Sequence, residues 1–270
     1  MVDKYAVIGN PIAHSKSPLI HEAFAKQTAQ DISYERVLAP LDGFSATVQD
    51  LVAKGYKGVN VTVPFKFEAY DLANQLMPHA LDAGAANTLL FSNQGIVADN
   101  TDGAGLVRDI TQNLKQSIAG KRVLLLGAGG AAEGVLHPIL ACEPSMLVIA
   151  NRSLDKALSM VKKVGSLKVS LAGCEFSSLQ GHEFDIVINA TSAGLTDTAL
   201  PIPDTIFAKG CLAYDMMYGR ETPFMAQARR NGARVADGLG MLIEQAAEAF
   251  YLWRNVRPKT QPVIAMVRAL

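Results

Sequence analysis

The feature of this sequence that most constrains its fold is an apolar run that ends in closely spaced glycines. Val-Leu-Leu-Leu at 123–126 is followed at once by glycines and alanines at 127–132. This order predicts a buried strand, a tight turn with almost no side chains, and a helix whose N-terminus can face phosphates. The spacing fits G-x-G-x-x-G/A and favours a dinucleotide over the alternative, a turn that serves packing alone.

The end of the next expected strand indicates which dinucleotide binds. NAD sites usually place Asp or Glu there for the ribose diol, but this chain has Asn151-Arg152-Ser153-Leu154-Asp155-Lys156. Arg152 and Lys156 lie one helical turn apart if a helix starts near Ser153, so both can face a 2′-phosphate. The alternative is that Ser153 caps the helix and the basic side chains are merely solvated. The absence of Asp or Glu at this position and the presence of two basic residues favour NADP.

The composition of the chain excludes several classes of protein. Its 270 residues carry 25 basic and 25 acidic side chains, without a basic tract for nucleic acid or a basic amphipathic segment for a membrane surface. No apolar run approaches the roughly 18 residues of a membrane span, and the N-terminus lacks the layout of a secretion signal. Cys142, Cys174 and Cys211 match no metal-ligand spacing. We therefore expect a cytoplasmic protein with no metal, no nucleic-acid partner and no membrane partner, which acts on a small molecule as a monomer or homodimer.

The alternation of short strands and helices predicts an α/β fold with two domains. The chain is 49% hydrophobic and can bury a large core, and 270 residues is near the length at which single cores divide. This rhythm predicts a mostly parallel sheet with helices on both faces in the first third of the chain. The strands expected there are 5–9, 34–39, 58–63 and a hairpin of 86–91 with 95–98, and the helices are 18–27, 44–54 and 67–75.

The rest of the chain continues the same rhythm and predicts a Rossmann-type, doubly wound nucleotide domain. After a helix at 103–114 and the glycine-rich unit, the expected strands are 146–150, 168–171, 185–189, 211–216 and 234–236, and the expected helices are 154–164 and 223–231. Two further helices are expected at 239–254 and 260–269. The domains are therefore expected to be 1–102, 103–238 and 239–270.

One strand of the first domain carries polar residues toward the edge of the sheet where ligands bind in open α/β folds. Residues 58–66 read Gly-Val-Asn-Val-Thr-Val-Pro-Phe-Lys, so alternation puts Asn60 and Thr62 on the face opposite the valines. Pro64 ends the strand and leaves Lys66 just beyond its C-terminal end. A lone lysine is usually only a solvated charge, and Lys66 taken singly has that plainer interpretation.

Other polar residues have both a structural and a functional interpretation. Asp102 can cap the next expected helix, or it can act at the domain boundary, where substrate and cofactor sites often meet. Ser17 precedes a proline and can start a helix, but that does not account for Ser15 in the same turn; two hydroxyls there suit a polyhydroxylated or carboxylated ligand. Asn87 can be a turn residue or a ligand contact, and Gln245 can make a boundary hydrogen bond or a ligand contact. The five histidines form no triad and no metal spacing, and we interpret them as incidental.

Taken together, these stretches resemble the shikimate dehydrogenase family over nearly the whole chain. The most specific are Asn60-Val61-Thr62-Val63-Pro64-Phe65-Lys66 and Asn100-Thr101-Asp102-Gly103, supported by Gly9-Asn10-Pro11 and residues 237–242. The resemblance implies reversible NADPH-dependent reduction of 3-dehydroshikimate to shikimate in aromatic amino-acid biosynthesis, with Lys66 and Asp102 as the catalytic pair. It also implies that the C-terminal helices pack on the first domain.

The same resemblance implies the residues of two binding sites. The substrate site would comprise Ser15, Ser17, Thr62, Lys66, Asn87, Asp102, Tyr218 and Gln245. The cofactor site would comprise Gly127, Ala128, Gly129, Gly130, Ala131, Asn151, Arg152, Ser153, Lys156, Met216 and Gly238. The chain departs from the family pattern at two places. Lys156 stands where arginine is frequent, and residues 194–200 differ from the sequence that is commonest in the family. Lysine keeps the charge but loses the bidentate fork, so a somewhat looser preference for NADP is expected.

The chemistry of the residue types supports the implied mechanism. Reducing a ketone by hydride builds negative charge on the carbonyl oxygen, and an ammonium such as Lys66 can stabilise that charge and supply the proton. A nearby Asp102 carboxylate would favour the charged ammonium and orient it. The alternatives are a quinate/shikimate dehydrogenase with relaxed NAD/NADP use, a catalytically silent metabolite sensor, and a folate-type dehydrogenase on a similar two-domain plan.

Overall fold

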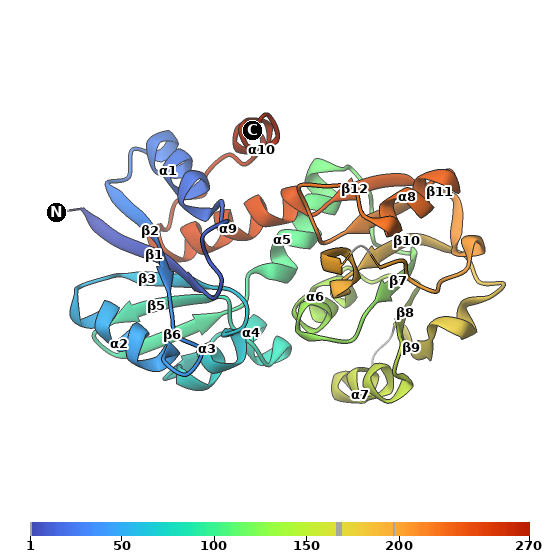
Figure 1. The fold of residues 1–270 in the computed structure, drawn as a ribbon, viewed down its shortest axis with the longest axis horizontal. Coiled ribbons are helices and arrows are strands. Elements are labelled where there is room, and N and C mark those ends of the chain that lie inside the picture. Colours follow the sequence, from blue (N-terminus) through green and yellow to red (C-terminus); the bar gives the residue numbers. More distant parts are fainter. Residues whose placement is uncertain (1, 166–168, 197) are drawn as a thin grey trace. The chain divides into compact units, whose positions relative to one another are not determined.

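The computed structural model describes residues 2–165, 169–196 and 198–270, which fold into two compact units (Figure 1). The first unit comprises residues 1–105 and 242–270, and the second comprises residues 106–241. The chain therefore leaves the first unit and returns to it after completing the second. The units divide the chain a few residues later than the expected boundaries at 102 and 238. Among the helices of the described ranges, none is both long and apolar enough to cross a membrane.

The first unit is built on a six-stranded mixed sheet. In spatial order its strands are β2 (Ile32–Leu38), β1 (Asp3–Gly9), β3 (Gly58–Val61), β5 (Thr88–Ser92), β6 (Gly95–Asp99) and β4 (Gln75–Leu76). The pairs β1–β2, β1–β3 and β4–β6 are parallel, whereas β3–β5 and β5–β6 are antiparallel. β5 and β6 are the expected hairpin, and the antiparallel insertion places β5 directly beside β3.

Helices cover this sheet and bury its apolar side chains. They are α1 (Ser17–Thr28), α2 (Phe44–Ala53), α3 (Lys66–Leu72), α4 (Pro78–Ala83), most of α9 (Leu239–Arg254) and α10 (Gln261–Arg268). Val59 and Val61 of β3 pack with Phe44 and Val48 of α2 in one buried cluster, together with Phe65 just before α3. The valines of β3 therefore face this core, as the alternation of the sequence predicts.

Residues 67–76 differ from the single helix expected over 67–75. α3 ends at Leu72 because Ala73 adopts an extended conformation, with ψ at 139°. The side-chain oxygen of Asn74 then accepts a hydrogen bond from the backbone N–H of Ile96 at 2.8 Å, which directs the chain into β4 beside β6. The next helix, α4, begins at Pro78, and proline is favoured at the start of a helix because its φ is already helical. Neither β4 nor α4 was expected.

The second unit contains a six-stranded sheet in which the neighbouring strands all run parallel. Its spatial order is β12 (Arg234–Asp237), β11 (Phe207–Asp215), β10 (Phe184–Asn189), β7 (Arg122–Leu126), β8 (Met146–Asn151) and β9 (Ser170–Glu175). This is the doubly wound arrangement expected for a nucleotide domain. The strand expected at 168–171 begins at Ser170 and extends to Glu175, and residue 168 itself lies outside the described residues. β11 begins at Phe207, ahead of the expected start at 211.

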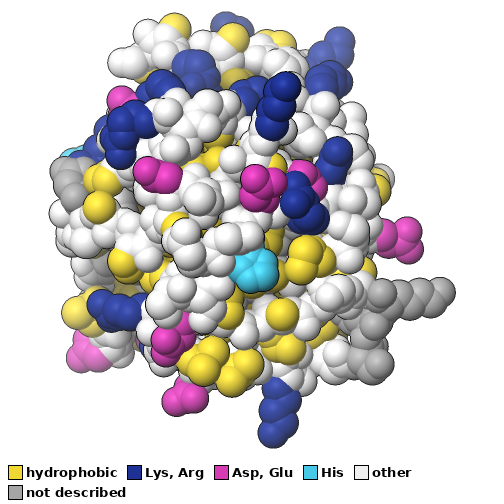
Figure 2. Space-filling view, turned by 90° about the vertical axis from the view of Figure 1, so that its right-hand side faces the viewer, with side chains coloured by type: hydrophobic (Ala, Val, Ile, Leu, Met, Phe, Trp, Pro, Cys, Tyr) yellow, Lys and Arg dark blue, Asp and Glu magenta, His cyan; other side chains and the backbone are white. Residues whose placement is uncertain are grey.

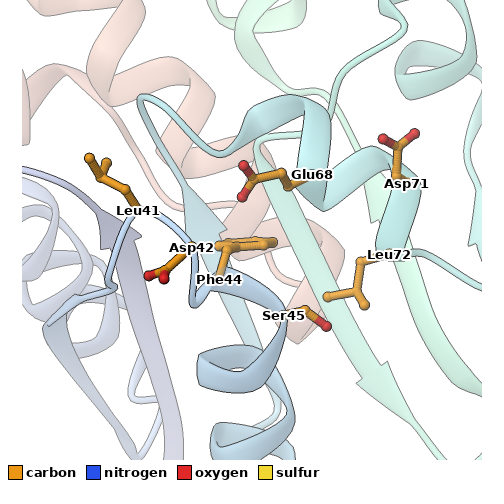
Figure 3. A pocket seen from close by; sticks show the side chains of 7 residues that line it. All are labelled: Leu41, Asp42, Phe44, Ser45, Glu68, Asp71 and Leu72. Atoms are coloured by element: carbon orange, nitrogen blue, oxygen red, sulfur yellow. The ribbon is translucent and has the colours of Figure 1, made fainter.

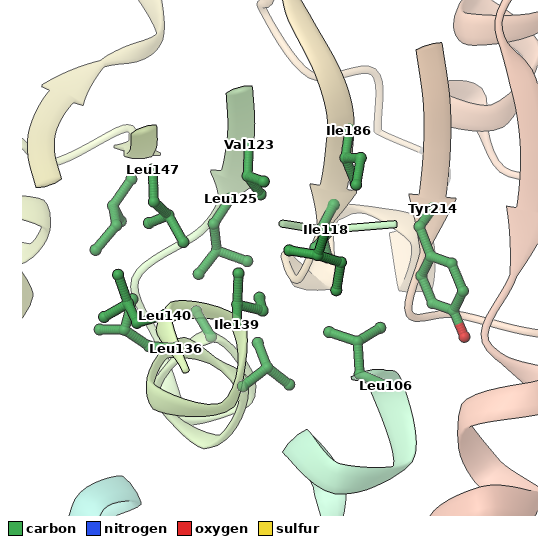
Figure 4. Packing of buried hydrophobic residues seen from close by; sticks show 14 of the residues in the cluster. Leu106, Ile118, Val123, Leu125, Leu136, Ile139, Leu140, Leu147, Ile186 and Tyr214 are labelled. Carbon is green, nitrogen blue, oxygen red and sulfur yellow. The ribbon is translucent and has the colours of Figure 1, made fainter. Parts of the chain in front are cut away.

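Both faces of this parallel sheet are buried, which accounts for the continuous apolar run at 123–126. Val123 and Leu125 pack with Leu136 and Ile139 of α6 (Gly130–Leu140), as Figure 4 shows. Leu124 and Leu126 join a second cluster on the other face, which includes residues of α8 (Pro223–Arg230). The helix α7 (Leu154–Val164) has the expected bounds. Short 3-10 turns lie at Phe176–Leu179, Ser192–Thr196 and Asp204–Ile206.

The helix expected at 103–114 is formed in two parts. α5 covers Asp102–Arg108, and a π-helical turn, η1, continues from Asp109 to Asn113. Within the second unit the buried Asp109 carboxylate accepts a hydrogen bond from the Tyr214 hydroxyl of β11 at 2.7 Å. This buried polar contact fixes η1 against the sheet.

The C-terminal segment packs on the first unit, to which residues 242–270 belong. The indole N–H of Trp253 donates to the backbone oxygen of Leu89 at 3.0 Å, and its ring stacks on Tyr5 at 4.6 Å. The next residue, Arg254, forms an ion pair with Asp3 at the start of β1. Two strands far from α9 in sequence are therefore bonded to its last turn.

Candidate functional site

Lys66 and Asp102 form an ion pair within the first unit. Lys66 is the first residue of α3, held just past β3 because its own backbone oxygen accepts from Ala86 and the neighbouring Phe65 is fully buried. Its ammonium lies 2.5 Å from Oδ2 of Asp102. The two side chains are 27% and 13% exposed, so the pair is shielded on most sides but open to a ligand. The lysine is therefore not a lone solvated charge.

The other oxygen of the Asp102 carboxylate is also engaged. Asn87 donates to Oδ1 from its side-chain amide at 2.8 Å, while the backbone N–H of Asp102 donates to the side chain of Asn100. Asp102 is the first helical residue of α5, and its side chain bonds to residues of two other segments. A role limited to capping α5 does not account for these contacts.

Asn87 links this pair to the C-terminal helix α9. Its amide nitrogen lies 3.4 Å from the side-chain oxygen of Gln245, and the Gln245 amide nitrogen donates to the backbone oxygen of Leu242. Asn87 is fully buried and Gln245 is partly exposed. Four of the expected substrate residues are thus joined by direct hydrogen bonds: Lys66, Asp102, Asn87 and Gln245.

The serines of the first turn lie together at the start of α1. The Ser15 hydroxyl lies 3.2 Å from the Ser17 hydroxyl and accepts from the Ser17 backbone N–H at 3.3 Å. Arg36 of β2 donates twice, from Nε and Nη2, to the backbone oxygen of Ser15 at 2.9 and 2.6 Å. This guanidinium fixes the turn, and sequence reasoning missed it because the only signal was a charged residue on an edge strand.

Thr62 follows β3, which ends at Val61 and not at 63 as expected. The strand stops there because the Phe65 N–H turns back to the Thr62 carbonyl, which starts the turn that leads to Lys66. The Thr62 hydroxyl makes no hydrogen bond to any residue of the described ranges. It is therefore free to bind a ligand.

The second unit places the glycine-rich turn between β7 and α6. Gly127 has φ at +106°, and a Cβ there would lie 3.2 Å from the backbone of Ala190, so a side chain is excluded on two grounds. Gly129 occupies the N-cap position of α6, and a Cβ on it would meet open space. The free backbone N–H groups at this helix N-terminus, from Gly129 to Ala131, are suited to phosphate oxygens.

Two positively charged side chains that follow β8 are exposed to solvent. Arg152 and Lys156 are both exposed, and neither forms an ion pair with another residue in the described part of the chain. Ser153 is at the N-cap position of α7, but its hydroxyl does not bond to the helix backbone. The Asn151 amide instead donates to the Ser153 carbonyl at 3.0 Å and shapes this turn. The exposed basic side chains fit both solvated charges and a phosphate site, so the choice between them stays a prediction.

Three further expected residues also lie in the second unit, around the end of β11. A Cβ on Gly238 would collide with the Met216 carbonyl oxygen, so only glycine permits this approach. Buried Asp215 accepts from Thr222 and from the Met217 backbone, which fixes the loop that carries Tyr218. Burial raises the pKa of the Tyr218 phenol. Tyr218 belongs to a different unit from the other expected substrate residues, and its role stays a prediction.

The described pockets do not coincide with these residues. One, of about 360 Å³, is lined by Leu41, Phe44, Ser45 and Leu72 and by the carboxylates of Asp42, Glu68 and Asp71 (Figure 3). None of the expected site residues lines it. Three carboxylates at its rim would repel a carboxylate or phosphate ligand. The hydrogen-bonded cluster around Asp102 is therefore the candidate site.

Other kinds of reactive centre find little support in the described residues. These contain no group of three or more His, Cys, Asp or Glu side chains that could hold a metal ion. The three cysteines are free thiols. Burial raises the pKa of Cys142 and Cys174, and it raises the pKa of Cys211 to about 12, which disfavours the reactive thiolate. On the face shown in Figure 2, basic side chains are more frequent toward the top of the view, and most acidic side chains lie in its middle and lower parts.

Three families of protein domain match this chain. The shikimate dehydrogenase substrate binding domain matches residues 7–89, and the shikimate/quinate 5-dehydrogenase family matches residues 109–196. The shikimate 5′-dehydrogenase C-terminal domain matches residues 238–268. The three matches follow one another along most of the sequence.

Individual relatives agree with these matches. The chain is 64% identical over 269 residues to the shikimate dehydrogenase (NADP(+)) of Methylobacillus flagellatus, with 99% of this chain and 100% of that protein covered. It is 59% identical over 271 residues to the enzyme of the same name from Dechloromonas aromatica, with 100% and 98% covered.

Solved structures share the fold. An Ael1 enzyme from Pseudomonas putida is 48% identical, with a TM-score of 0.94 over 98% of this chain and 97% of that one. Shikimate 5-dehydrogenase from Thermus thermophilus, in complex with NADP(H) and shikimate, is 28% identical, with a TM-score of 0.88 over 100% and 99%.

Proposed function

The chain belongs to the shikimate dehydrogenase family, and on that premise we propose that Lys66 and Asp102 catalyse the reversible conversion of 3-dehydroshikimate to shikimate. As a member of this family it is an NADP-dependent oxidoreductase. The observation that carries the proposal is the 2.5 Å contact between the Lys66 ammonium and the Asp102 carboxylate at a partly open position. The reaction belongs to aromatic amino-acid biosynthesis.

Lys66 would move the proton of the reaction. When bound, NADPH supplies a hydride to the carbonyl carbon of the ketone, and the electrons of the C=O bond move onto the oxygen. The Lys66 ammonium stabilises this developing charge and transfers a proton to the oxygen, which completes the hydroxyl group. In the reverse direction, neutral Lys66 would remove the hydroxyl proton, and a bound NADP would supply the hydride acceptor.

Asp102 would hold that ammonium and also bind the substrate. One carboxylate oxygen accepts from the Lys66 ammonium and orients it. Its remaining lone pairs can accept a hydrogen bond from a ring hydroxyl of the substrate. Asn87, which already donates to Oδ1, keeps the carboxylate in one orientation during this exchange.

The remaining polar residues would hold the two ligands. Hydroxyl groups suit the carboxylate and hydroxyl groups of a small cyclic acid, which supports Thr62, Ser15 and Ser17 as substrate contacts. Gln245 and Tyr218 are proposed as further contacts. We propose that residues 1–105 with 242–270 supply the substrate contacts other than Tyr218, and that residues 106–241 bind NADP. The cofactor contacts proposed are Gly127, Ala128, Gly129, Gly130, Ala131, Asn151, Arg152, Ser153, Lys156, Met216 and Gly238.

The positive charges of Arg152 and Lys156 support the choice of cofactor. Lys156 is exposed in the first turn of α7, and Arg152 is exposed just before that helix. β8 ends in Asn151 and not in the carboxylate that a ribose diol would need. A guanidinium gives a phosphate two parallel hydrogen bonds, whereas the ammonium of Lys156 adds charge without that geometry. Three free thiols are in keeping with a cytoplasmic location.

Initial rates with shikimate and quinate, each with NADP and with NAD, test this proposal. The pair of shikimate with NADP should give the highest kcat/KM. Comparable rates with quinate or with NAD would instead identify a quinate/shikimate dehydrogenase of relaxed specificity. Absence of turnover with all four pairs, despite retained NADPH binding, would indicate a silent metabolite sensor.

A further inference from the structure

We propose that Tyr34, Asn60 and Thr88 form a hydrogen-bond chain that fixes the Asn87 amide and, through it, positions the Asp102 carboxylate. The inference rests on the proposed catalytic pair and adds positioning residues to it. None of the three is expected to touch substrate or cofactor, although the Tyr34 hydroxyl also interacts with the side chain of Ser17, one of the proposed substrate contacts. The chain runs from Asp102 outward to Tyr34, and the direction of each proton in it can be assigned in turn.

The Asp102 end decides how the Asn87 amide is turned. A carboxylate oxygen only accepts hydrogen bonds, so Asn87 must present its NH₂ group to Oδ1, 2.8 Å away. The Asn87 amide oxygen then faces the opposite way, toward donors. It accepts from the Thr101 backbone N–H at 2.9 Å, from the Thr101 hydroxyl at 3.1 Å and from the Thr88 hydroxyl at 2.9 Å.

The orientation is passed on through Thr88 to the neighbouring strand. A threonine hydroxyl has one proton, and when Thr88 donates it to Asn87, its lone pairs must accept from elsewhere. They accept from the Asn60 side-chain NH₂ at 3.0 Å. Asn60 and Thr88 are directly opposite partners in the antiparallel pair of β3 and β5, so the register of the sheet brings them together.

Tyr34 closes the outer end of the chain. With its NH₂ group turned to Thr88, Asn60 offers its oxygen to the Tyr34 hydroxyl, which donates at 2.8 Å. Burial raises the pKa of Tyr34 well above its ordinary value, so the phenol keeps the proton that it donates. Its ring stacks on the buried His21 at 4.1 Å and 6°, which holds the hydroxyl in place.

Every donor in this chain therefore points toward the carboxylate. Asn60, Thr88, Asn87 and Thr101 are all buried, so water does not replace a broken link readily. Reversing the Asn87 amide would bring its oxygen against the Asp102 carboxylate, and the repulsion would move Asp102 away from Lys66. The chain prevents that reversal and presets the geometry on which proton transfer depends.

The experiment compares two substitutions at one position. Thr88→Val keeps the shape but removes the hydroxyl, whereas Thr88→Ser keeps the hydroxyl and removes a methyl group. We expect Thr88→Val to lower kcat about tenfold and Thr88→Ser to stay within about twofold, with the KM for NADP unchanged in both. Tyr34→Phe should lower kcat about threefold, and Tyr56→Phe, which removes an exposed phenol bonded to Glu35, is the matched control.

A double variant separates positioning from general stability. In the Thr88→Val background, Tyr34→Phe should cause no further loss of kcat, because the link between them is already broken, although the melting temperature can fall further. Two results would contradict the proposed hydrogen-bond chain while leaving the catalytic pair intact. One is a double variant whose loss of kcat equals the combined losses of the two single variants, and the other is equal kcat values for Thr88→Val and Thr88→Ser. Near-normal turnover in Lys66→Ala would overturn both proposals, since the chain acts through that pair.

Discussion

The two groups of candidate residues differ in how completely the protein itself satisfies them. In the first unit, both oxygens of Asp102 and both polar atoms of the Asn87 amide are already engaged by neighbouring side chains or backbone. In the second unit, Arg152 and Lys156 are exposed and lack an ion-pair partner among the described residues. One site is assembled by the fold, and the other presents charge to the solvent.

This difference teaches what each region has to do. A proton transfer depends on donor and acceptor geometry at the scale of a hydrogen bond, so the catalytic side chains need fixed partners. A 2′-phosphate carries concentrated charge that flexible basic side chains can reach from several directions. Substitutions in the first site should therefore lower kcat, and substitutions in the second should weaken cofactor binding.

Removing the Lys66 ammonium should have the largest effect on turnover of all the substitutions proposed. A small effect would contradict the contrast between the two sites. Lys66→Ala should lower kcat by about 10²–10⁴-fold, the scale of lost general acid–base catalysis, while the Kd for NADPH, measured by fluorescence titration, barely changes. Lys54→Ala is the control, because this lysine of the same unit forms an exposed pair with Asp50. Turnover near the wild-type value would remove Lys66 from the mechanism.

Removing a charge from the nucleotide unit should act on affinity and not on the chemical step. Arg152→Ala should raise the KM for NADP by about 10- to 100-fold, as expected for one lost charge-assisted contact, and change the KM for NAD far less. The value of kcat at saturating NADP should stay close to normal. Lys162→Ala, which removes another exposed charge of α7, should change neither constant. Equal losses for NADP and NAD would mean that Arg152 does not bind the 2′-phosphate.

Much of this division could be predicted from sequence because it depends on local patterns. The bounds of α7, the glycine turn after β7 and the position of Lys66 just beyond β3 all follow from neighbouring residues, although β3 ends before the proline that was expected to stop it. The pairing of Asn60 with Thr88 could not be predicted in this way. It depends on β5 lying beside β3 in antiparallel register, and a non-local register has no signature in either strand.

Other differences have the same origin in long-range contacts. β4 exists because Asn74 bonds to a strand that comes later in the chain, whereas the local pattern favours a continued helix. Arg36 has its role because the Ser15 carbonyl lies within reach of β2. His21, interpreted as incidental from the sequence, is fully buried because α1 packs its ring on Tyr34. A buried residue of this kind gives the first unit a property that can be measured.

His21 should make the first unit sensitive to acid, an effect smaller than the preceding two. Burial lowers the pKa of His21 to about 3, against an ordinary value of 6.5. Between these values the unfolded chain binds a proton that the folded chain does not, so stability falls as the pH drops below 6.5, by about 1.4 kcal/mol per unit. His21→Phe removes this titration while keeping an aromatic ring in the stack. Relative to that variant, the wild type should lose about 2 kcal/mol between about pH 6.5 and about pH 5.

The single tryptophan reports on the relevant unit, since Trp253 lies in the first unit with its ring 5.5 Å from His21. Urea unfolding followed by its fluorescence at several pH values therefore measures the stability of that unit. His182→Gln, which removes an exposed histidine of the second unit, should leave the profile unchanged. Parallel pH profiles of unfolding free energy for the wild type and His21→Phe would show that His21 is protonated equally in the folded and unfolded states. The dense packing of the first site would then not extend to the His21 ring that stacks on Tyr34.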